Sequence, residues 1–320
     1  MQTQNLATIT QFFSSFPCPI ATNEPATQGQ AHFVVYGETL NQLKLSQFQQ
    51  KCGENFVILE AWNVLHNTVV LLRGNWQPQW LDYAHALCLD SALLGFVPRL
   101  TQAGLLVMDM DSTAIQIECI DEIAKLAGTG ELVSSITAQA MRGELDFEQS
   151  LRRRVATLKG APETILQRVR DNLPLMPGLE DTLAVLQQHG WKTAIASGGF
   201  TYFTDHLKQC LKLDYTVANR FAIVEGKLTG EVAGEVVDAQ YKARTLSELA
   251  EKFNLDLPYT VAIGDGANDL AMLEVAGMGV ALHAKPKVQQ QAKVVVNFAD
   301  FSALLCLLSA NDKLIHTNKE

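Results

Sequence analysis

The sequence has little positive charge, and no stretch of it is rich in lysine or arginine. Its 320 residues include 25 lysines and arginines against 34 aspartates and glutamates, which gives a formal net charge of -9. A field of that sign repels nucleic acid and anionic membrane surfaces. We therefore expect no nucleic-acid partner, although a local cluster of donors can still hold one small anion.

Paired cysteines of the kind that bind zinc or close disulfide frameworks are also absent. The six cysteines are scattered, without a CxxC pair and without histidine at zinc-ligand spacing: Cys18, Cys52, Cys88, Cys119, Cys210 and Cys306. Scattered cysteines of this kind are usually reduced, as in cytosolic proteins. They predict a cytoplasmic location.

Long hydrophobic runs are missing as well. The start, MQTQNLATITQFF, lacks the positive charge and the continuous apolar stretch of a signal peptide. The longest apolar run, near Phe301 to Leu308, is far shorter than the roughly 20 residues that cross a bilayer. With 48% hydrophobic residues and no repeat or low-complexity tract, we expect a globular protein without a membrane partner.

The first hundred residues predict a small α+β module. After a polar lead-in interrupted by prolines, the pattern gives a strand, a helix, two strands joined at His66-Asn67, and a helix. Their ranges are 32–36, 40–51, 56–65, 68–73 and 79–93. This order is part of a ferredoxin-like fold, so we expect residues 1–97 to form an N-terminal domain. Packing or dimerisation, as a homodimer through this domain, is the simpler role, and small-molecule binding is the alternative.

Beyond a linker that contains Pro98, apolar strands alternate with helical segments. The predicted strands are 105–110, 192–197, 259–264, 277–282 and 293–297, and a hairpin is expected over 221–234. Parallel strands need crossovers, so residues 98–320 predict a doubly wound parallel α/β sheet with a Rossmann-like core. About eighty residues without a strand follow the first of these strands. Their helical patterns predict a cap inserted over about 117–176.

Two aspartates end the first of these strands, in the stretch LLVMDMDSTA that begins at Leu105. A pair spaced in this way can place one carboxylate on a bound cation and leave the other free for proton transfer. Alone, DxD also occurs in solvated turns and in metal-dependent glycosyltransferases. The strand before it and the hydroxyls of Ser112 and Thr113 favour a functional site at the carboxyl end of the sheet.

A second strand end carries acids of the same kind. The strand 260–264 runs into the sequence GDGAND, which contains Asp265 and Asp269. Mg²⁺ prefers oxygen ligands and usually takes one or two carboxylates, so Asp109 and Asp265 from neighbouring strands would suffice for it. Asp269 would then support the ligands. By itself the string is also compatible with a capped helix start.

Two further features fit an anion at this edge of the sheet. The strand that ends at Ser197 is followed by two glycines, whose backbone N–H groups can approach a phosphate closely. Lys242 lies in the helical segment 239–253. Each feature alone has an ordinary explanation, as a surface loop and as a solvated lysine.

Taken together, the strand-DxDST, strand-SGG, lysine and strand-GDGAND set resembles the haloacid dehalogenase superfamily of aspartate-nucleophile phosphotransferases. The match covers about residues 105–296. Within it, several segments are similar to the phosphoserine phosphatase family: MDMDSTAIQIECIDEIA, MRGELDFEQSLRRRVATLKG, LPLMPG, IASGGF and AIGDGANDL. The resemblance implies Mg²⁺-dependent hydrolysis of O-phospho-L-serine to L-serine and phosphate through an aspartyl-phosphate, the last step of serine biosynthesis.

The resemblance also implies a role for each residue at the sheet edge. Asp109 is the expected nucleophile and Asp111 the general acid and base. The phosphoryl oxygens are expected to be held by Ser197 and Lys242, with Gly198 and Asn268 completing their surroundings. The expected ligands of Mg²⁺ are Asp109, Asp265 and the backbone carbonyl of Asp111.

In the cap, the resemblance places the substrate-contacting acid on Glu118 and the arginine on Arg154, with Met141 and Phe147 closing over the ligand. Helical geometry independently favours Arg154 among three consecutive arginines, because it lies seven residues, nearly two turns, from Phe147. Glu118 is singled out only by the family register, since Asp121 lies close by. O-phospho-L-serine carries a dianionic phosphate, a carboxylate and an ammonium group, so a site that binds it requires side chains of both charges.

The mechanism requires that Asp111 hold a proton near neutral pH, against an ordinary pKa of about 4. Repulsion by the Asp109 carboxylate shifts the pKa of Asp111 in the required direction. Two alternatives stay open: hydrolysis or phosphoryl transfer on another small phosphomonoester, and an amino-acid sensor with an inert catalytic remnant. His283 lies at a strand end, and we expect a structural role for it.

Overall fold

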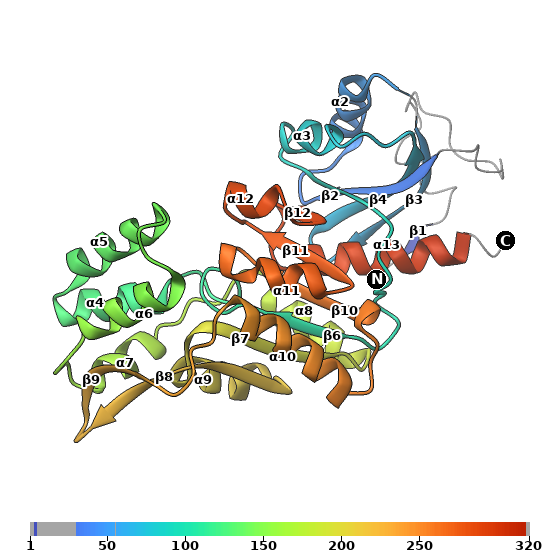
Figure 1. Cartoon of the computed structure of the whole chain (residues 1–320). Coiled ribbons are helices and arrows are strands. Elements are labelled where there is room, and N and C mark those ends of the chain that lie inside the picture. The colour runs from blue at the N-terminus through green and yellow to red at the C-terminus, as the bar shows by residue number, and fades with distance from the viewer. Residues whose placement is uncertain (1–2, 5–29, 55, 318–320) are drawn as a thin grey trace. The chain divides into compact units, whose positions relative to one another are not determined.

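The computed structural model describes residues 3–4, 30–54 and 56–317, which fall into two compact units (Figure 1). One unit comprises residues 1–104, 177–191 and 280–320, and the other comprises residues 105–176 and 192–279. Most of the predicted polar lead-in lies outside the described residues. No helix in the described part of the chain is both long and apolar enough to cross a membrane.

The first unit is built on an antiparallel sheet of five strands in the order β1-β3-β4-β2-β5. Its elements are β1 (Thr3–Gln4), β2 (Ala31–Gly37), α2 (Gln42–Cys52), β3 (Val57–Val64), β4 (Asn67–Gly74), α3 (Trp80–His85) and β5 (Asp90–Leu93). From β2 to β5 this is the complete ferredoxin-like order, so the expected α+β fold is confirmed. Alternate residues such as Phe33 and Val35 join one buried cluster with Phe48 and Trp80 of the two helices.

The predicted helix over residues 79–93 is wrong, because α3 ends at His85 and the chain returns as the strand β5. Cys88, between them, has a φ of 54°, in the left-handed region that a helix cannot continue through. Residues 90–93 pair with β2, from Tyr36↔Asp90 to Phe33↔Leu93. A short apolar run satisfies either a helix or a strand, and here the open edge of β2 determines the outcome.

The C-terminal helix α13 (Ala303–Thr317) packs against β2, β3 and β4 of this sheet. The indole Nε1 of Trp62 donates to Ser309 Oγ at 3.1 Å, and Asn67 Nδ2 donates to Ser302 Oγ at 2.8 Å. The same unit contains α8 (Leu179–Gln188), α12 (Pro286–Gln289) and β12 (Val294–Val296). The N-terminal module therefore shares its core with segments from the end of the chain.

His283, in the same unit, has a φ of 46°, and its Nε2 lies 2.9 Å from the carbonyl oxygen of Ala299. A ring held in this way connects two loops, which fits the structural role expected for it. The predicted domain limits, 1–97 and 98–320, stay a prediction.

The second unit contains a sheet with the strand order β10-β6-β7-β8-β9. Its strands are β6 (Leu105–Met108), β7 (Lys192–Phe200), β8 (Tyr215–Val224), β9 (Lys227–Ala233) and β10 (Thr260–Gly264). In the first unit, residues 280–282 of β11 (Met278–Leu282) pair in parallel with β12. Pairing is parallel from β10 through β6 and β7 to β8, which confirms the predicted doubly wound α/β core. All four residues of β6 are fully buried, as an apolar run between covered faces requires.

Helices α9 (Thr201–Leu211), α10 (Ala239–Lys252) and α11 (Leu270–Val275) follow strands of this sheet, and a short 3₁₀ turn (Ala267–Asp269) precedes α11. The expected hairpin is present, since β8 and β9 pair antiparallel around Glu225-Gly226. Glu225 and Gly226 both have positive φ, which the tight turn requires.

The expected helical cap is also present between β6 and β7. It consists of α4 (Cys119–Ala127), α5 (Gly130–Met141), α6 (Phe147–Ala156) and α7 (Thr164–Arg170). Local sequence fixes these limits: Gly128 ends α4 with a φ of 74°, and Asp146 caps α6 by accepting the Gln149 N–H at 2.8 Å. Backbone hydrogen bonds join the cap to the hairpin, including Gly160 N–H to Leu228 O at 2.8 Å.

Candidate active site

Asp109 is the first residue beyond β6, and its position is fixed by the backbone on both sides. Its N–H donates to Ile263 O of β10 at 3.0 Å, and its own Oδ1 accepts the Met110 N–H at 2.7 Å. The residue is 5% exposed, and Oδ2 lies 2.9 Å from Lys242 Nζ. A buried strand therefore presents one preoriented carboxylate.

Lys242, from α10, is fully buried between two carboxylates. Its Nζ lies 2.9 Å from Asp109 Oδ2 and 2.8 Å from Asp269 Oδ1. Burial alone would lower the pKa of Lys242, but the two carboxylates outweigh it and raise that pKa above its usual value. A solvated helix lysine, the ordinary explanation for this residue, is excluded.

Asp269 supports Lys242 from the other side. Its Oδ2 accepts the N–H of Gly266 at 2.9 Å while Oδ1 faces the lysine. Burial, together with the charge of Asp109, raises the pKa of Asp269, and Lys242 opposes that rise. Both oxygens of Asp269 therefore hold other groups of the protein.

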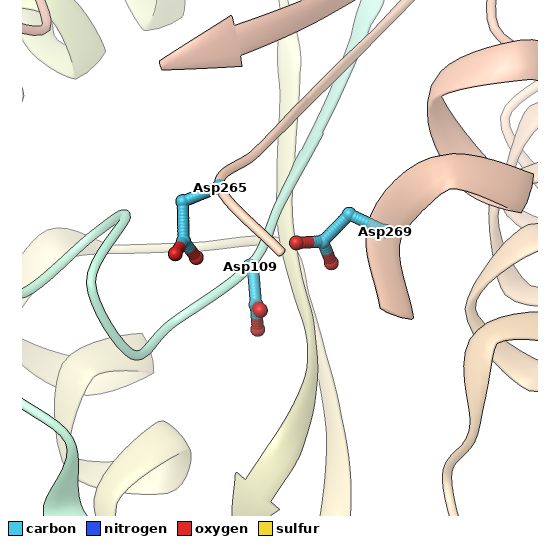
Figure 2. Close-up of side chains that lie close together, drawn as sticks. All are labelled: Asp109, Asp265 and Asp269. Atoms are coloured by element: carbon cyan, nitrogen blue, oxygen red, sulfur yellow. The ribbon is translucent and has the colours of Figure 1, made fainter. Parts of the chain in front are cut away.

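Three buried carboxylates, from the segments that follow β6 and β10, converge at this edge of the sheet (Figure 2). One oxygen each from Asp109, Asp265 and Asp269 lies within 4.8 Å of the others. Asp265 is 7% exposed, and its Oδ1 is 3.5 Å from Thr113 Oγ1. A set of buried carboxylate oxygens suits a hard divalent cation. Asp109 and Asp265, the two carboxylates that the sequence predicts as ligands, both belong to this cluster.

Asp111 lies where the cap begins. Its Oδ1 accepts the backbone N–H of Cys119, the first residue of α4, at 3.0 Å. Burial raises the pKa of Asp111 to about 8, and the charges of Glu118 and Asp109 add to this, whereas the Cys119 N–H opposes it. The direction of this pKa shift is the one predicted from the sequence. Its main cause is burial, and repulsion by Asp109 is a lesser contribution.

The two glycines after Ser197 lie against neighbouring side chains. A Cβ on Gly199 would lie 2.6 Å from Asp111 Oδ2, and one on Gly198 would lie 2.7 Å from Phe147 Cζ. The Gly199 N–H donates to Ser197 Oγ at 2.9 Å. Asp111, the loop after Ser197 and Phe147 of the cap are therefore in close contact.

Asn268 lies beside the same loop. Its Nδ2 is 3.8 Å from the position of a Cβ on Gly198, and its Oδ1 is 2.3 Å from that of a Cβ on Gly266. The structure thus brings Asn268 close to Gly198, while the phosphate-binding role expected for both stays a prediction. The close approach also explains the glycine at position 266.

In the cap, Glu118 and Arg154 face the same region as Asp111. Glu118 Oε1 accepts a hydrogen bond from Ser112 Oγ at 2.8 Å. Burial lowers the pKa of Arg154, while the nearby charges of Glu118, Asp121 and Asp111 raise it. The buried Nε of Arg154 has no hydrogen-bond partner within the described residues. An arginine in that position is prepared to receive an anion.

Met141 is the exception among the predicted residues. It is the last residue of α5, and its side chain is 75% exposed. Phe147, by contrast, already lies on Gly198. The structure therefore brings one of the two expected closing residues to the site and leaves the other at the surface.

Two contributors were missed from the sequence. The backbone N–H of Cys119 orients Asp111, and the side chain of Asn219 holds the carbonyl oxygen of Gly198 at 2.8 Å. A backbone donor leaves no signal in the residue type. An asparagine inside the apolar strand TVANRFAIV was a visible signal, because buried polar side chains are usually hydrogen-bonded.

Comparison with known proteins agrees with this geometry. The family model described as haloacid dehalogenase-like hydrolase matches residues 106–274. A second model, a domain of unknown function (DUF5609), matches residues 29–93. The first match covers the five strands and the cap of the second unit, and the second covers the N-terminal module.

Curated relatives extend over nearly the whole chain. The phosphoserine phosphatase of Haemophilus influenzae is 63% identical over 314 residues, which cover 98% of this chain and 100% of that protein. The phosphoserine phosphatase of Vibrio cholerae is 53% identical, covering 88% of this chain and 86% of that protein.

Among the solved structures, too, this chain is similar to phosphoserine phosphatases. The crystal structure of a probable phosphoserine phosphatase from Vibrio cholerae, unliganded, has a TM-score of 0.86 at 48% identity and covers 99% of this chain and 96% of that one. The structure of a phospho-aspartyl intermediate analogue of phosphoserine phosphatase has a TM-score of 0.61 at 40% identity, and the match covers 64% of this chain and 98% of that one.

Proposed function

The chain belongs to the haloacid dehalogenase-like hydrolase family, among its phosphoserine phosphatases, and we propose that it hydrolyses O-phospho-L-serine to L-serine and phosphate. One observation carries this proposal. Two carboxylates one residue apart are in opposite environments, since Asp109 lies against Lys242 and burial raises the pKa of Asp111 to about 8. One short turn thereby provides both a carboxylate that can act as nucleophile, Asp109, and a carboxyl group that can act as acid, Asp111.

In the first step, an oxygen of Asp109 attacks phosphorus in line with the serine oxygen. The new O–P bond forms an aspartyl-phosphate as the bond from phosphorus to the serine oxygen breaks. Asp111, still protonated near neutral pH, donates its proton to the departing oxygen. Serine therefore leaves as a neutral alcohol.

In the second step, water attacks the phosphorus of the aspartyl-phosphate. Asp111, now a carboxylate, accepts a proton from that water, and the bond from phosphorus to Asp109 breaks. Phosphate is released, and both aspartates return to their starting protonation states. The same carboxyl group thus serves as acid and as base, as microscopic reversibility requires.

Magnesium is the cation we propose for the acidic cluster, with Asp109, Asp265 and the backbone carbonyl of Asp111 as its ligands. The donor set fits, because buried carboxylate oxygens from two neighbouring strands meet there. When bound, Mg²⁺ neutralises charge on the phosphoryl oxygens. Lys242 contributes a second, permanent positive charge beside Asp109.

The phosphoryl group is held by Ser197, Gly198, Lys242 and Asn268. Two of these, Ser197 and Lys242, are fully buried, so their interactions with an anion act in a region of low dielectric constant. Uncatalysed hydrolysis of phosphate monoesters is among the slowest of reactions, so positioning and charge must provide most of the acceleration.

The cap selects the amino-acid part of the substrate. We assign the substrate carboxylate to Arg154, whose buried Nε lacks a partner among the described residues, and the ammonium to Glu118. Phe147 covers the loop at Gly198, and Met141 would complete the cover when α5 moves inward. Matching both ends of an amino acid argues against a general phosphomonoesterase.

Phosphate release from L-phosphoserine, with and without Mg²⁺, tests the proposal directly. Phosphothreonine and phosphoethanolamine are the comparison substrates, because the first adds a methyl group and the second lacks the carboxylate. A preference for phosphoethanolamine would favour another small phosphomonoester. Restored growth of a serine auxotroph that lacks its own phosphatase would place the reaction at the last step of serine biosynthesis.

For the N-terminal module we propose a packing and dimerisation role. Helix α13 contacts its sheet, and α2 and α3 share the buried cluster on it, which leaves less open surface for an amino-acid ligand. Light scattering on the full-length protein tests for a homodimer. We also propose a cytoplasmic location, in keeping with the five cysteines of the described residues, all of them unpaired.

A further inference from the structure

Asn219 is a residue of β8 with a buried side chain. Hydrogen bonds at both ends of its amide group hold that side chain in one orientation. It is 1% exposed, its Nδ2 donates to the carbonyl oxygen of Gly198 at 2.8 Å, and its Oδ1 accepts the N–H of Val237 at 2.9 Å. Turning the amide over would break both hydrogen bonds. The donor therefore always faces the loop that follows Ser197.

This side chain lies where the pairing of two strands is interrupted. Strands β7 and β8 pair through Ala196↔Val217, and the pairing resumes at Phe200↔Asn219. The whole SGG loop of β7 therefore lies opposite the single residue Ala218 of β8, as in a bulge. The amide of Asn219 provides a hydrogen bond that the strand ladder cannot provide there.

Consecutive glycines make such a bond necessary. A Cβ on Gly198 would lie 2.7 Å from Phe147 Cζ and one on Gly199 would lie 2.6 Å from Asp111 Oδ2, so a larger residue at either position would displace a neighbouring side chain. Two glycines leave the peptide between them easy to rotate. A half-turn would replace the Gly199 N–H with the Gly198 carbonyl oxygen, which repels a phosphate where an N–H attracts it.

The observed orientation directs the Gly199 N–H toward Ser197, the residue assigned to the phosphoryl group. In a trans peptide the carbonyl oxygen and the following N–H point in opposite directions. While Asn219 holds the Gly198 carbonyl, the Gly199 N–H donates to Ser197 Oγ at 2.9 Å. Because the Gly198 carbonyl oxygen is held in place, the direction of the Gly199 N–H in the same peptide is fixed as well.

The second hydrogen bond of Asn219 reaches the helix that carries Lys242. Val237 precedes Asp238, whose side chain caps α10 and whose carbonyl oxygen accepts the N–H of Lys242 at 3.0 Å. One amide therefore connects the loop of Ser197 to the start of the helix that delivers the buried lysine.

We propose that Asn219 is a positioning residue that locks the Gly198–Gly199 peptide and sets the distance between that loop and α10, so that phosphate is bound tightly. This inference rests on the proposed function, because it assigns the loop to the phosphoryl group. Asn219 does not itself touch the substrate. Its effect is on phosphate and not on the amino-acid part, which the cap holds.

Titration calorimetry of the full-length protein with inorganic phosphate, and separately with L-serine, tests the proposal with MgCl₂ present. Asn219→Leu removes both hydrogen bonds, and Asn219→Asp keeps an acceptor for Val237 but loses the donor to Gly198. We expect phosphate to bind at least about tenfold more weakly to both, the scale of one lost hydrogen bond. L-serine should bind within about twofold of the wild type.

Thr229→Val is the matched control, since it removes a side-chain hydrogen bond to Ala222 O in the same hairpin, 3.1 Å long and away from the loop. It should change neither affinity. Unchanged phosphate affinity in a folded Asn219 variant, or a parallel loss for phosphate and serine, would overturn the proposal.

Hydrogen exchange on the wild-type protein gives a test that needs no variant. The Gly199 amide is expected to be protected, and an unprotected amide would overturn the proposal even if both Asn219 variants fail to fold. A wild-type protein that binds phosphate tightly but releases none from phosphoserine would defeat the proposed function and leave this inference standing. The two failures are therefore distinguishable.

Discussion

The edge of the parallel sheet and the helical cap both contribute to the site, but they hold their charged groups differently. At the sheet edge the fixed groups hold one another, as Lys242 does between Asp109 and Asp269. In the cap, Met141 is 75% exposed, and the buried Nε of Arg154 has no hydrogen-bond partner in the described chain. The charged groups of the sheet edge are thus already paired within the protein, whereas in the cap Arg154 keeps a buried donor for which the described chain has no partner.

The largest effect should come from removing the nucleophile at the sheet edge. Asp109→Asn keeps the shape of the side chain but not its charge, so kcat for phosphoserine should fall by at least about 10⁴-fold. Phosphate release measures the loss, and the melting temperature serves as the control for folding. Retention of most of the activity would refute the assignment of Asp109.

The second effect tests how strongly the groups of the sheet edge depend on one another. Lys242→Met leaves two carboxylates buried without their cation, which should destabilise the protein by about 3–5 kcal/mol and abolish activity. Chemical denaturation measures the stability. Adding Asp269→Asn should recover part of the stability but none of the activity, because the charge beside Asp109 is still missing. An equally unstable double variant would contradict this account.

These two regions also differ in how well the sequence predicted them. The DxD, SGG and GDGAND strings each follow an apolar strand, so the order of strands in a parallel sheet was enough to bring them together. The fully buried Lys242 could not be recognised from its own surroundings, because a single lysine in an amphipathic helix is usually solvated. Only the resemblance to a family identified it.

What the sequence could not provide depends on contacts between distant segments. The main cause of the raised pKa of Asp111 is burial, which only the folded chain creates. The strand β5 was mistaken for helix because its partner β2 lies more than fifty residues earlier. Asn219, a polar residue in an apolar strand, was a visible signal, but its partner, a carbonyl oxygen of the neighbouring strand, could not be identified from the sequence.

In the cap, the expected effect is one of selectivity. Arg154→Lys removes the planar fork that suits a carboxylate, so kcat/KM for phosphoserine should fall by about 10–100-fold. Phosphoethanolamine, which has no carboxylate, should be affected far less.

Arg152→Lys is the control for this prediction, because Arg152 lies on the same helix and is paired with Glu148 at 2.7 Å on the exposed face. It should leave the kinetics of both substrates unchanged. Equal losses of kcat/KM for the two substrates in Arg154→Lys would show that Arg154 supports the structure of the cap and does not bind the substrate carboxylate.

The pH dependence distinguishes the acid from the nucleophile. Because the pKa of Asp111 is raised to about 8, its proton is available through neutral pH and is lost above it, so kcat/KM should fall as the pH rises past about 8. A pH–rate profile with phosphoserine measures this, at an Mg²⁺ concentration that saturates the enzyme. A profile that stays flat to pH 9 would contradict the assignment of Asp111.

The same shift affects stability, with a sign that follows from proton binding. The pKa of Asp111 rises from 3.8 to about 8 on folding, so the folded protein holds one more proton between these values. The stability that this provides is complete below the lower value and is lost as the pH rises to the upper one. Metal-free wild type should therefore lose more stability than Asp111→Asn between about pH 4 and 8, as measured by thermal unfolding.

The smallest effect is expected where the cap meets the sheet edge. A Cβ on Gly198 would lie 2.7 Å from Phe147 Cζ, the far end of a side chain that can move, so Gly198→Ala should raise KM only severalfold, by an amount on the order of 1 kcal/mol. Phe147→Leu in the same protein should restore much of that loss by making room. Steady-state kinetics of the two single variants and the double variant give the coupling between them. If the effects simply add, Phe147 does not lie on Gly198 during turnover, and the cap reaches the phosphate loop through other residues.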